Sequence, residues 1–151
     1  MLTAQTYRNH THGTPTDHVS LTYEDRFLRR KVLTLASGAQ LLVDLPQTTS
    51  LDHGGALITG DKAEVEIQAA PEPLLEVTGD SLHRIAWHIG NRHTPCQIEE
   101  NRLLIQRDHV LADMLARIGA TTCEVIEPFT PEGGAYGHGR THGHDHTHSH
   151  T

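Results

Sequence analysis

Histidine is concentrated at the C-terminal end of the chain. Residues 138–151 read HGRTHGHDHTHSHT, and the six histidines of this segment are His138, His142, His144, His146, His148 and His150. Neutral imidazole is the commonest protein ligand for borderline divalent metal ions. A polar tether can collect such ions but cannot hold a reacting group in a fixed place. The segment therefore predicts metal handling rather than catalysis.

Two alternatives to metal binding stay open for this segment. An appended purification tag is normally an unbroken histidine run, whereas these histidines are interleaved with Gly, Thr, Asp and Ser and follow EPFTPEGGAYGHG without a vector-like junction. The second alternative is a solvated tail without a role. The rarity of histidine elsewhere in proteins favours metal binding over this alternative. We expect residues 131–151 to form a disordered, histidine-rich tail.

Two further histidines occupy the ends of predicted helices. His93 follows Gly90 in GNRHT, so it should lie on an exposed loop, and His109 follows the potential cap Asp108. One histidine is too few for a tight Zn or Ni site, which takes about four or more donors. Two copies of His93 near the two-fold axis of a dimer, joined by tail histidines, could supply them. For His109, the sequence alone favours a surface side chain at a helix end.

No constellation typical of an enzyme accompanies these histidines. Glu99 and Glu100 are adjacent on a predicted strand, so they point to opposite sides and form a poor acid/base pair. His83 and His88 are five residues apart on a predicted helix and do not form an i, i+4 metal clip. The G-x-S-x-G, P-loop, G-x-G-x-x-G and H-E-x-x-H motifs do not occur.

Composition restricts the class of partner. The formal charge is −7 with histidine neutral, so we expect no nucleic-acid partner, because phosphate contacts need Lys and Arg. The first residues, MLTAQTYRNHTHG, contain no apolar stretch of signal-peptide length, and no apolar run is long enough for a membrane span. Cys96 and Cys123 do not form a C-x-x-C pair. We expect a cytoplasmic protein with free thiols and no membrane association. One basic run is a potential docking patch or a solvated strand face: Arg26, Arg29, Arg30 and Lys31.

The pattern predicts an α+β protein with two small domains. Residues 1–17 should form a flexible extension, and residues 18–72 a small antiparallel β domain that docks a partner, because short alternating runs such as QLLVDL at 40–45 are separated by turn residues. Pro71, Glu72 and Pro73 predict a stiff hinge or linker.

Residues 73–130 predict a ferredoxin-like βαββαβ domain. PLLEVTG reads as a strand, and the spacing of Leu82, Ile85, Ala86 and Ile89 predicts a helix ending near Gly90. Strands at 95–100 and 102–106, a helix from Asp108 to Gly119 and a strand at 121–129 follow. Trp87 lies outside the apolar stripe of the first helix, so it either faces a self-association surface or sits at the edge of the core.

Several segments together resemble the UreE family of urease accessory proteins. They are DRFLRRKVLTLASG, LLVDLP, APEPLLEVTG, AWHIGNRHTPCQIEENRLLIQRDHVLADMLARIGA and EPFTPEGGAYGHG followed by the histidine-rich end. The resemblance covers about residues 18–151. The resemblance implies a β domain, a ferredoxin-like domain and a homodimer joined through the latter. It also implies that His93 of each subunit binds nickel at the dimer interface. His109 matches an auxiliary ligand of some members, and Arg107 stands where some carry histidine.

By this resemblance the function is that of a nickel metallochaperone without catalytic activity. It would deliver Ni(II) to apo-urease together with the accessory GTPase complex. Donor chemistry alone does not select nickel, because Zn(II) or Cu(II) can bind the same ligands. Two alternatives remain open: a histidine-rich nickel or zinc store unconnected to urease, and a metalloenzyme that uses His93 and His109.

Overall fold

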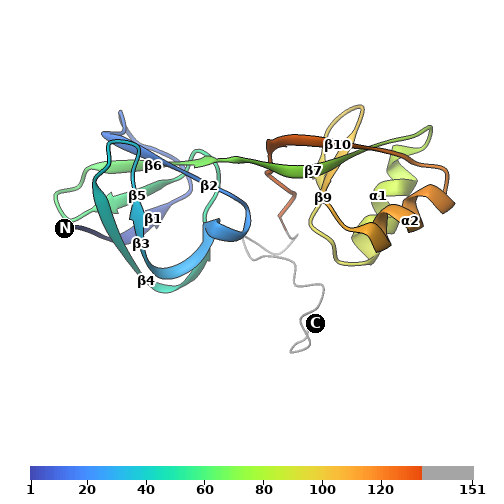
Figure 1. Cartoon of the computed structure of the whole chain (residues 1–151). Helices are drawn as coiled ribbons and strands as arrows, with labels where there is room; N and C mark the ends of the chain where they lie inside the picture. Colours follow the sequence, from blue (N-terminus) through green and yellow to red (C-terminus); the bar gives the residue numbers. More distant parts are fainter. Residues whose placement is uncertain (134–151) are drawn as a thin grey trace. The chain divides into compact units, whose positions relative to one another are not determined.

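The computed structural model describes residues 1–133 and confirms a mixed α+β class dominated by strands (Figure 1). The chain divides into two compact units, Met1–Ala70 and Pro71–Thr151. The six tail histidines lie outside the described residues. Neither helix in the described range has the length and apolar character that crossing a membrane requires.

The first unit is a six-stranded sheet with the strand order β2-β6-β5-β1-β4-β3. A short 3-10 turn, Glu24–Arg26, precedes β3. The pairs β1·β4 and β2·β6 are parallel, so the prediction of a purely antiparallel sheet is wrong for these two pairs. The strands are β1 (Leu2–Arg8), β2 (Asp17–Leu21), β3 (Phe27–Thr34), β4 (Gln40–Ser50), β5 (Ala56–Thr59) and β6 (Glu64–Ala69).

The prediction that residues 1–17 form a flexible extension is also wrong. β1 lies inside the sheet, antiparallel to β5 on one side and parallel to β4 on the other, and Ala4 is fully buried. Most other β1 side chains are exposed, so the strand lacks the alternation of apolar and polar residues that marks a half-buried strand. Backbone pairing on both sides, rather than its own side chains, places this segment.

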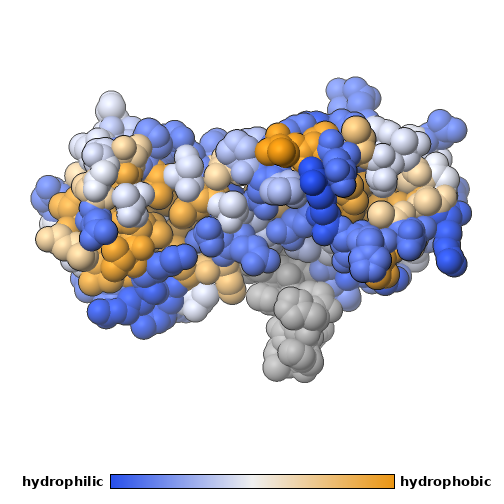
Figure 2. Space-filling model, in the orientation of Figure 1, coloured by the Kyte–Doolittle hydropathy of each residue, from blue (hydrophilic) through white to orange (hydrophobic). Residues whose placement is uncertain are grey.

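Alternating apolar residues build the core of the first unit. In β4, Leu41, Val43 and Leu45 are buried and point to the same face, as the two-residue period of a strand requires. Val65 and Ile67 of β6 join the same cluster. Figure 2 shows hydrophilic side chains over most of the visible surface, with apolar patches over strands of this unit and over β10 of the second unit.

A buried carboxylate fastens the loop after β1. Glu64, at the start of β6, accepts hydrogen bonds from the backbone N–H groups of His12 (2.8 Å) and Gly13 (3.0 Å) and from the Arg8 guanidinium (2.8 Å). These donors, the His12 N–H foremost, lower the pKa of Glu64 to about 2. The carboxylate is therefore charged at neutral pH and holds residues 9–13 against the sheet.

The basic run does not form a single patch, because Arg26 is buried. Its guanidinium donates hydrogen bonds to the backbone oxygens of Leu21 (3.0 Å) and Leu51 (3.1 Å), so it serves the fold rather than a partner. The other three cations are about half exposed and form ion pairs. Arg29 and Arg30 pair with Asp44, and Lys31 pairs with Asp25.

The second unit has the element order strand, helix, strand, strand, helix, strand. Its sheet order is β10-β7-β9-β8, and all neighbours are antiparallel. The elements are β7 (Pro71–Thr78), α1 (Leu82–Asn91), β8 (Gln97–Ile98), β9 (Leu103–Gln106), α2 (His109–Arg117) and β10 (Thr121–Pro128).

Pro71, Glu72 and Pro73 belong to β7, so the prediction of a linker there is wrong. Pro71 and Pro73 pair with β10 only, because the pairing of β7 with β9 begins at Leu74. Proline, which has no N–H to donate, is tolerated in such an end segment of a strand. The helices bury their apolar stripes against the sheet, with Ile85, Ile89, Leu111 and Leu115 in one cluster with Val77 and Leu103.

Candidate metal centre

His93 lies on an exposed loop directly after α1. Its backbone N–H donates to the oxygen of Gly90 (2.9 Å), and its φ of 58° places it in the left-handed region that residues with a Cβ rarely adopt. α1 ends at Asn91, with Arg92 as its C-cap. The turn that closes the helix thus includes His93. The sequence predicts a loop at this point.

His109 is the first residue of α2 and is exposed. The preceding residue, Asp108, caps the helix: its carboxylate accepts hydrogen bonds from the N–H groups of Val110 (2.9 Å) and Leu111 (3.2 Å). These bonds satisfy donors that have no partner within the helix. The cap fixes where the helix begins and thereby fixes the position of His109.

Replacement of Asp108 by alanine is expected to lower the free energy of unfolding by about 1 kcal/mol, because the helix loses its cap. Asp113→Ala, in the exposed middle of the same helix, removes the same charge without touching the cap and should cost clearly less. Urea unfolding of both variants measures the difference. Equal losses would show that the cap does not stabilise α2.

The topology brings His93 and His109 to the same end of the helical layer. α1 follows β7 and α2 follows β9, and these two strands are antiparallel neighbours, so the helices also run in opposite directions. The end of α1 is therefore level with the start of α2 (Figure 1). His93 and His109 therefore belong to one edge of the second unit.

Trp87 is exposed to 64%, which excludes a position at the edge of the core. It packs edge-on against His88, with ring centroids 5.1 Å apart. A shallow hollow of about 420 Å³ is lined by His83, Arg84, Trp87 and His88, so the two helix histidines border one surface around the indole. A large exposed aromatic ring of this kind suits a contact surface.

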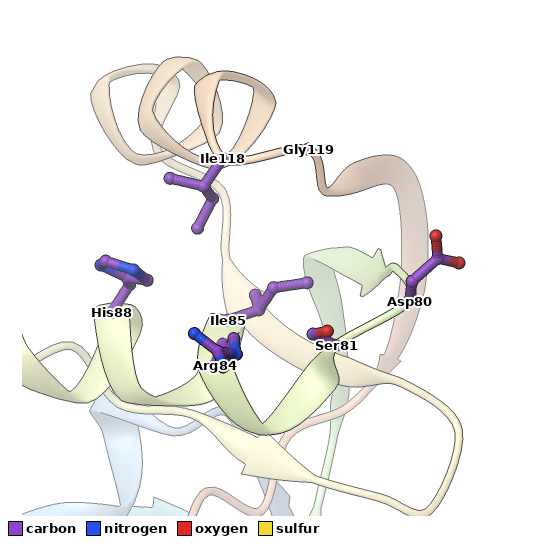
Figure 3. A pocket seen from close by; sticks show the side chains of 7 residues that line it. All are labelled: Asp80, Ser81, Arg84, Ile85, His88, Ile118 and Gly119. Atoms are coloured by element: carbon purple, nitrogen blue, oxygen red, sulfur yellow. The ribbon is translucent and has the colours of Figure 1, made fainter.

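A second hollow, of about 310 Å³, separates the start of α1 from the end of α2 (Figure 3). Ile118 points toward α1 across it, and Gly119, whose φ is 87°, closes α2. Asp80 and His88 lie at opposite ends of the hollow, so they do not form a chelating pair.

Both cysteines are free thiols, as expected. Cys96 is buried, and this burial, with a smaller contribution from the charge of Glu132, raises its pKa to about 11. A thiol must lose its proton to bind a metal ion, so Cys96 is a poor ligand at neutral pH. Cys123 is exposed on β10. Within residues 1–133, no three His, Cys, Asp or Glu side chains are grouped to hold a metal ion.

Family models match both units of the chain. The model of the UreE urease accessory protein, N-terminal domain, matches residues 2–70, and that of the C-terminal domain matches residues 72–151. The chain belongs to the UreE family. This confirms the resemblance drawn from the sequence.

Individual UreE-family proteins are also similar over most of their length. The urease accessory protein UreE of Ruegeria sp. (strain TM1040) is 65% identical over 141 residues, covering 93% of this chain and 80% of that protein. The UreE of Ruegeria pomeroyi is 68% identical over 125 residues, covering 83% and 84%. That of Rhodobacter capsulatus is 58% identical over 125 residues, covering 83% and 80%.

Arg107, for which the resemblance left an auxiliary ligand site open, has a structural role here. Its guanidinium donates to the backbone oxygens of Leu74 (3.1 Å) and Val125 (3.0 Å) and lies 3.8 Å from a carboxylate oxygen of Glu124. It thus ties together β7 and β10. No local pattern in the sequence signals this contact, because the three partners come from two other strands.

Proposed function

We propose that this member of the UreE family binds Ni(II) and delivers it to apo-urease during assembly of the enzyme's metal centre. The observation that carries the proposal is the family match over both units together with an exposed His93 in the GNRH motif. In this proposal the chain acts as a homodimer, with the accessory GTPase complex as partner and without catalysis of its own. The names of the relatives support the link to urease.

The proposed nickel site takes His93 from each of two subunits. The left-handed turn after α1 presents this imidazole to solvent, and His109 is available at the same end of the helical layer. The remaining donors are assigned to the tail histidines, because residues 1–133 of one chain do not group three ligands. The exposed Trp87, on the helix that leads to His93, favours this side of the unit as the contact between copies.

Such a site suits transfer of a metal ion. Ligands that come from separate chains and from a tail can be added or removed one at a time, whereas a closed four-ligand site holds its ion permanently. Copper should bind the same imidazoles more tightly than nickel, so nickel is assigned through the family and not through the donors.

Calorimetric nickel titration of His93→Ala tests this proposal. In a chain that ends at residue 137, the substitution should remove the tightest site. The loss of affinity should exceed that caused by removing an outer-shell partner of a metal ligand, which is about 10–100-fold. In the full chain, weaker binding to the tail should persist. Light scattering should still find a dimer, and urease activation in nickel-limited cells should fall.

His18→Ala, which removes an exposed histidine of the first unit, is the control and should leave nickel affinity unchanged. Unchanged affinity in the truncated His93→Ala chain would refute the assignment of the site. If only the full chain bound nickel, and urease activation did not depend on His93, a histidine-rich metal store would be the better description.

A further inference from the structure

The loop after β1 carries two histidines whose rings face each other. The Nε2 atoms of His10 and His12 are 3.2 Å apart, and the ring centroids are 4.9 Å apart. Two nitrogen ligands of one metal ion, each bonded at about 2.0–2.1 Å, lie roughly 2.9–3.4 Å apart in square or tetrahedral geometry. The distance between the two Nε2 atoms therefore lies within the range that two ligands of one divalent ion require.

The neighbouring asparagine selects the tautomer that metal binding needs. Oδ1 of Asn9 lies 2.8 Å from Nδ1 of His10, and a carbonyl oxygen can only accept, so Nδ1 of His10 carries the proton. Nε2 of a neutral His10 then has a free lone pair. Metal-binding histidines commonly show this arrangement, with the other ring nitrogen donating to an oxygen.

The backbone of the loop is fixed by a group outside it. Glu64 is buried and accepts the N–H groups of His12 and Gly13, so the position of the second histidine does not depend on the first. A pair of ligands held in this way loses less conformational freedom on binding than two histidines on a free chain.

We propose that His10 and His12 form a bidentate site for a borderline divalent metal ion, Ni(II), Cu(II) or Zn(II), in the first unit. The site is separate from His93, which belongs to the second unit. It does not depend on the proposed delivery of nickel to urease.

The proton that lies between the two Nε2 atoms must leave this position before a metal ion can bind there. With Nδ1 of His10 protonated, the hydrogen between the two Nε2 atoms belongs to His12. On binding, this proton moves through water to Nδ1 of His12, so two neutral imidazoles bind the ion without net release of a proton. Both rings are exposed, and water or a ligand from a partner fills the other coordination positions. A metal ion bound at such an exposed pair can easily pass to other ligands.

Nuclear magnetic resonance of the full ¹⁵N-labelled chain tests the site directly. Cu(II) chloride, which binds such ligands more tightly than nickel, should broaden the amide signals of Thr11, His12 and Gly13. In the double variant His10→Ala/His12→Ala this broadening should disappear, and calorimetry should find one ion fewer per chain. Asn9→Ala should keep the site but weaken it about tenfold or more.

His18→Ala, on the neighbouring strand β2, is the matched control and should leave the broadening intact. Amide spectra without metal show whether each variant is folded. Persistence of the broadening in the folded double variant would show that the ion sits on other ligands, such as the tail, and would overturn the proposal. The same would follow if the loop signals of the unchanged chain did not respond. Either outcome leaves the role of His93 untouched.

Discussion

Replacement of Ala4 by aspartate is expected to unfold the first unit. Ala4 is fully buried in β1, between β4 and β5, and belongs to the main cluster of the unit. An unpaired carboxylate there would lose its hydration without gaining a partner, at a cost of several kcal/mol. That cost is comparable with the whole stability of a small domain, about 5–15 kcal/mol. Circular dichroism and amide spectra would show the loss of the sheet.

Gln5→Asp is the matched control, because it places the same charge one residue further along the strand on an exposed side chain. It should leave the sheet folded. The second unit has a core of its own and should keep its dispersed amide signals in both variants. If Ala4→Asp were as stable as Gln5→Asp, β1 would not belong to the core.

Replacement of Arg102 by methionine is expected to destabilise the second unit. The guanidinium of Arg102 contacts Glu76 (3.1 Å), Glu99 (2.9 Å) and Glu127 (2.6 Å), so the variant leaves three carboxylates facing one another. At neutral pH we expect a loss of roughly 2 kcal/mol in the free energy of unfolding. Larger values hold for fully buried pairs, whereas each of these side chains keeps a quarter to a third of its surface exposed.

The difference between the variant and the unchanged protein should shrink in acid. Hydrogen bonds from Arg102 lower the pKa of Glu127, so its contribution is complete above the unfolded value of about 4.3 and is lost as pH falls through the lower folded value. In the variant the carboxylates repel one another, and protonation in acid removes this repulsion, so acid stabilises the fold of the variant relative to neutral pH. Urea unfolding between about pH 3 and about pH 7 tests this. Arg117→Met, at the exposed end of α2, should show no comparable trend, and a gap independent of pH would contradict the mechanism.

Elements with local signals could be predicted from the sequence. The second helix begins at His109, as the capping residue Asp108 indicates, and Gly119 follows it with the positive φ that a glycine beyond a helix end permits. The run at 40–45 is buried at every second residue, and β4 continues from it to Ser50. In each case the physical cause lies within a few residues of its effect.

Elements positioned by distant partners could not be predicted. β1 shows no apolar alternation, because its place depends on pairing with β4 and β5. Arg26 has the composition of a surface cation, and only the fold supplies the two backbone oxygens that bury its guanidinium. Local patterns carry no information about such contacts, since the partners are remote in sequence.

The candidate site could be predicted in part from the sequence. The glycine at the end of α1 placed His93 on a loop, and the sequence motif identified the family. That His109 lies at the same end follows only from the antiparallel pairing of β7 and β9. The close approach of the His10 and His12 rings could not be predicted from the sequence, because it depends on the contact between their loop and Glu64, more than fifty residues away.

The position of β10 has a consequence for the solubility of the protein. Within residues 1–133, β10 pairs only with β7, so its other side is an open sheet edge of the kind on which strands of other molecules can stack into aggregates. Ile126, which is 68% exposed, favours such association because it is apolar. Glu124 and Glu127 lie on either side of Ile126 in the strand. Charged residues beside an apolar strand act as gatekeepers against such stacking. Because Arg102 lowers the pKa of Glu127, this carboxylate keeps its charge at pH values where an ordinary glutamate is already protonated.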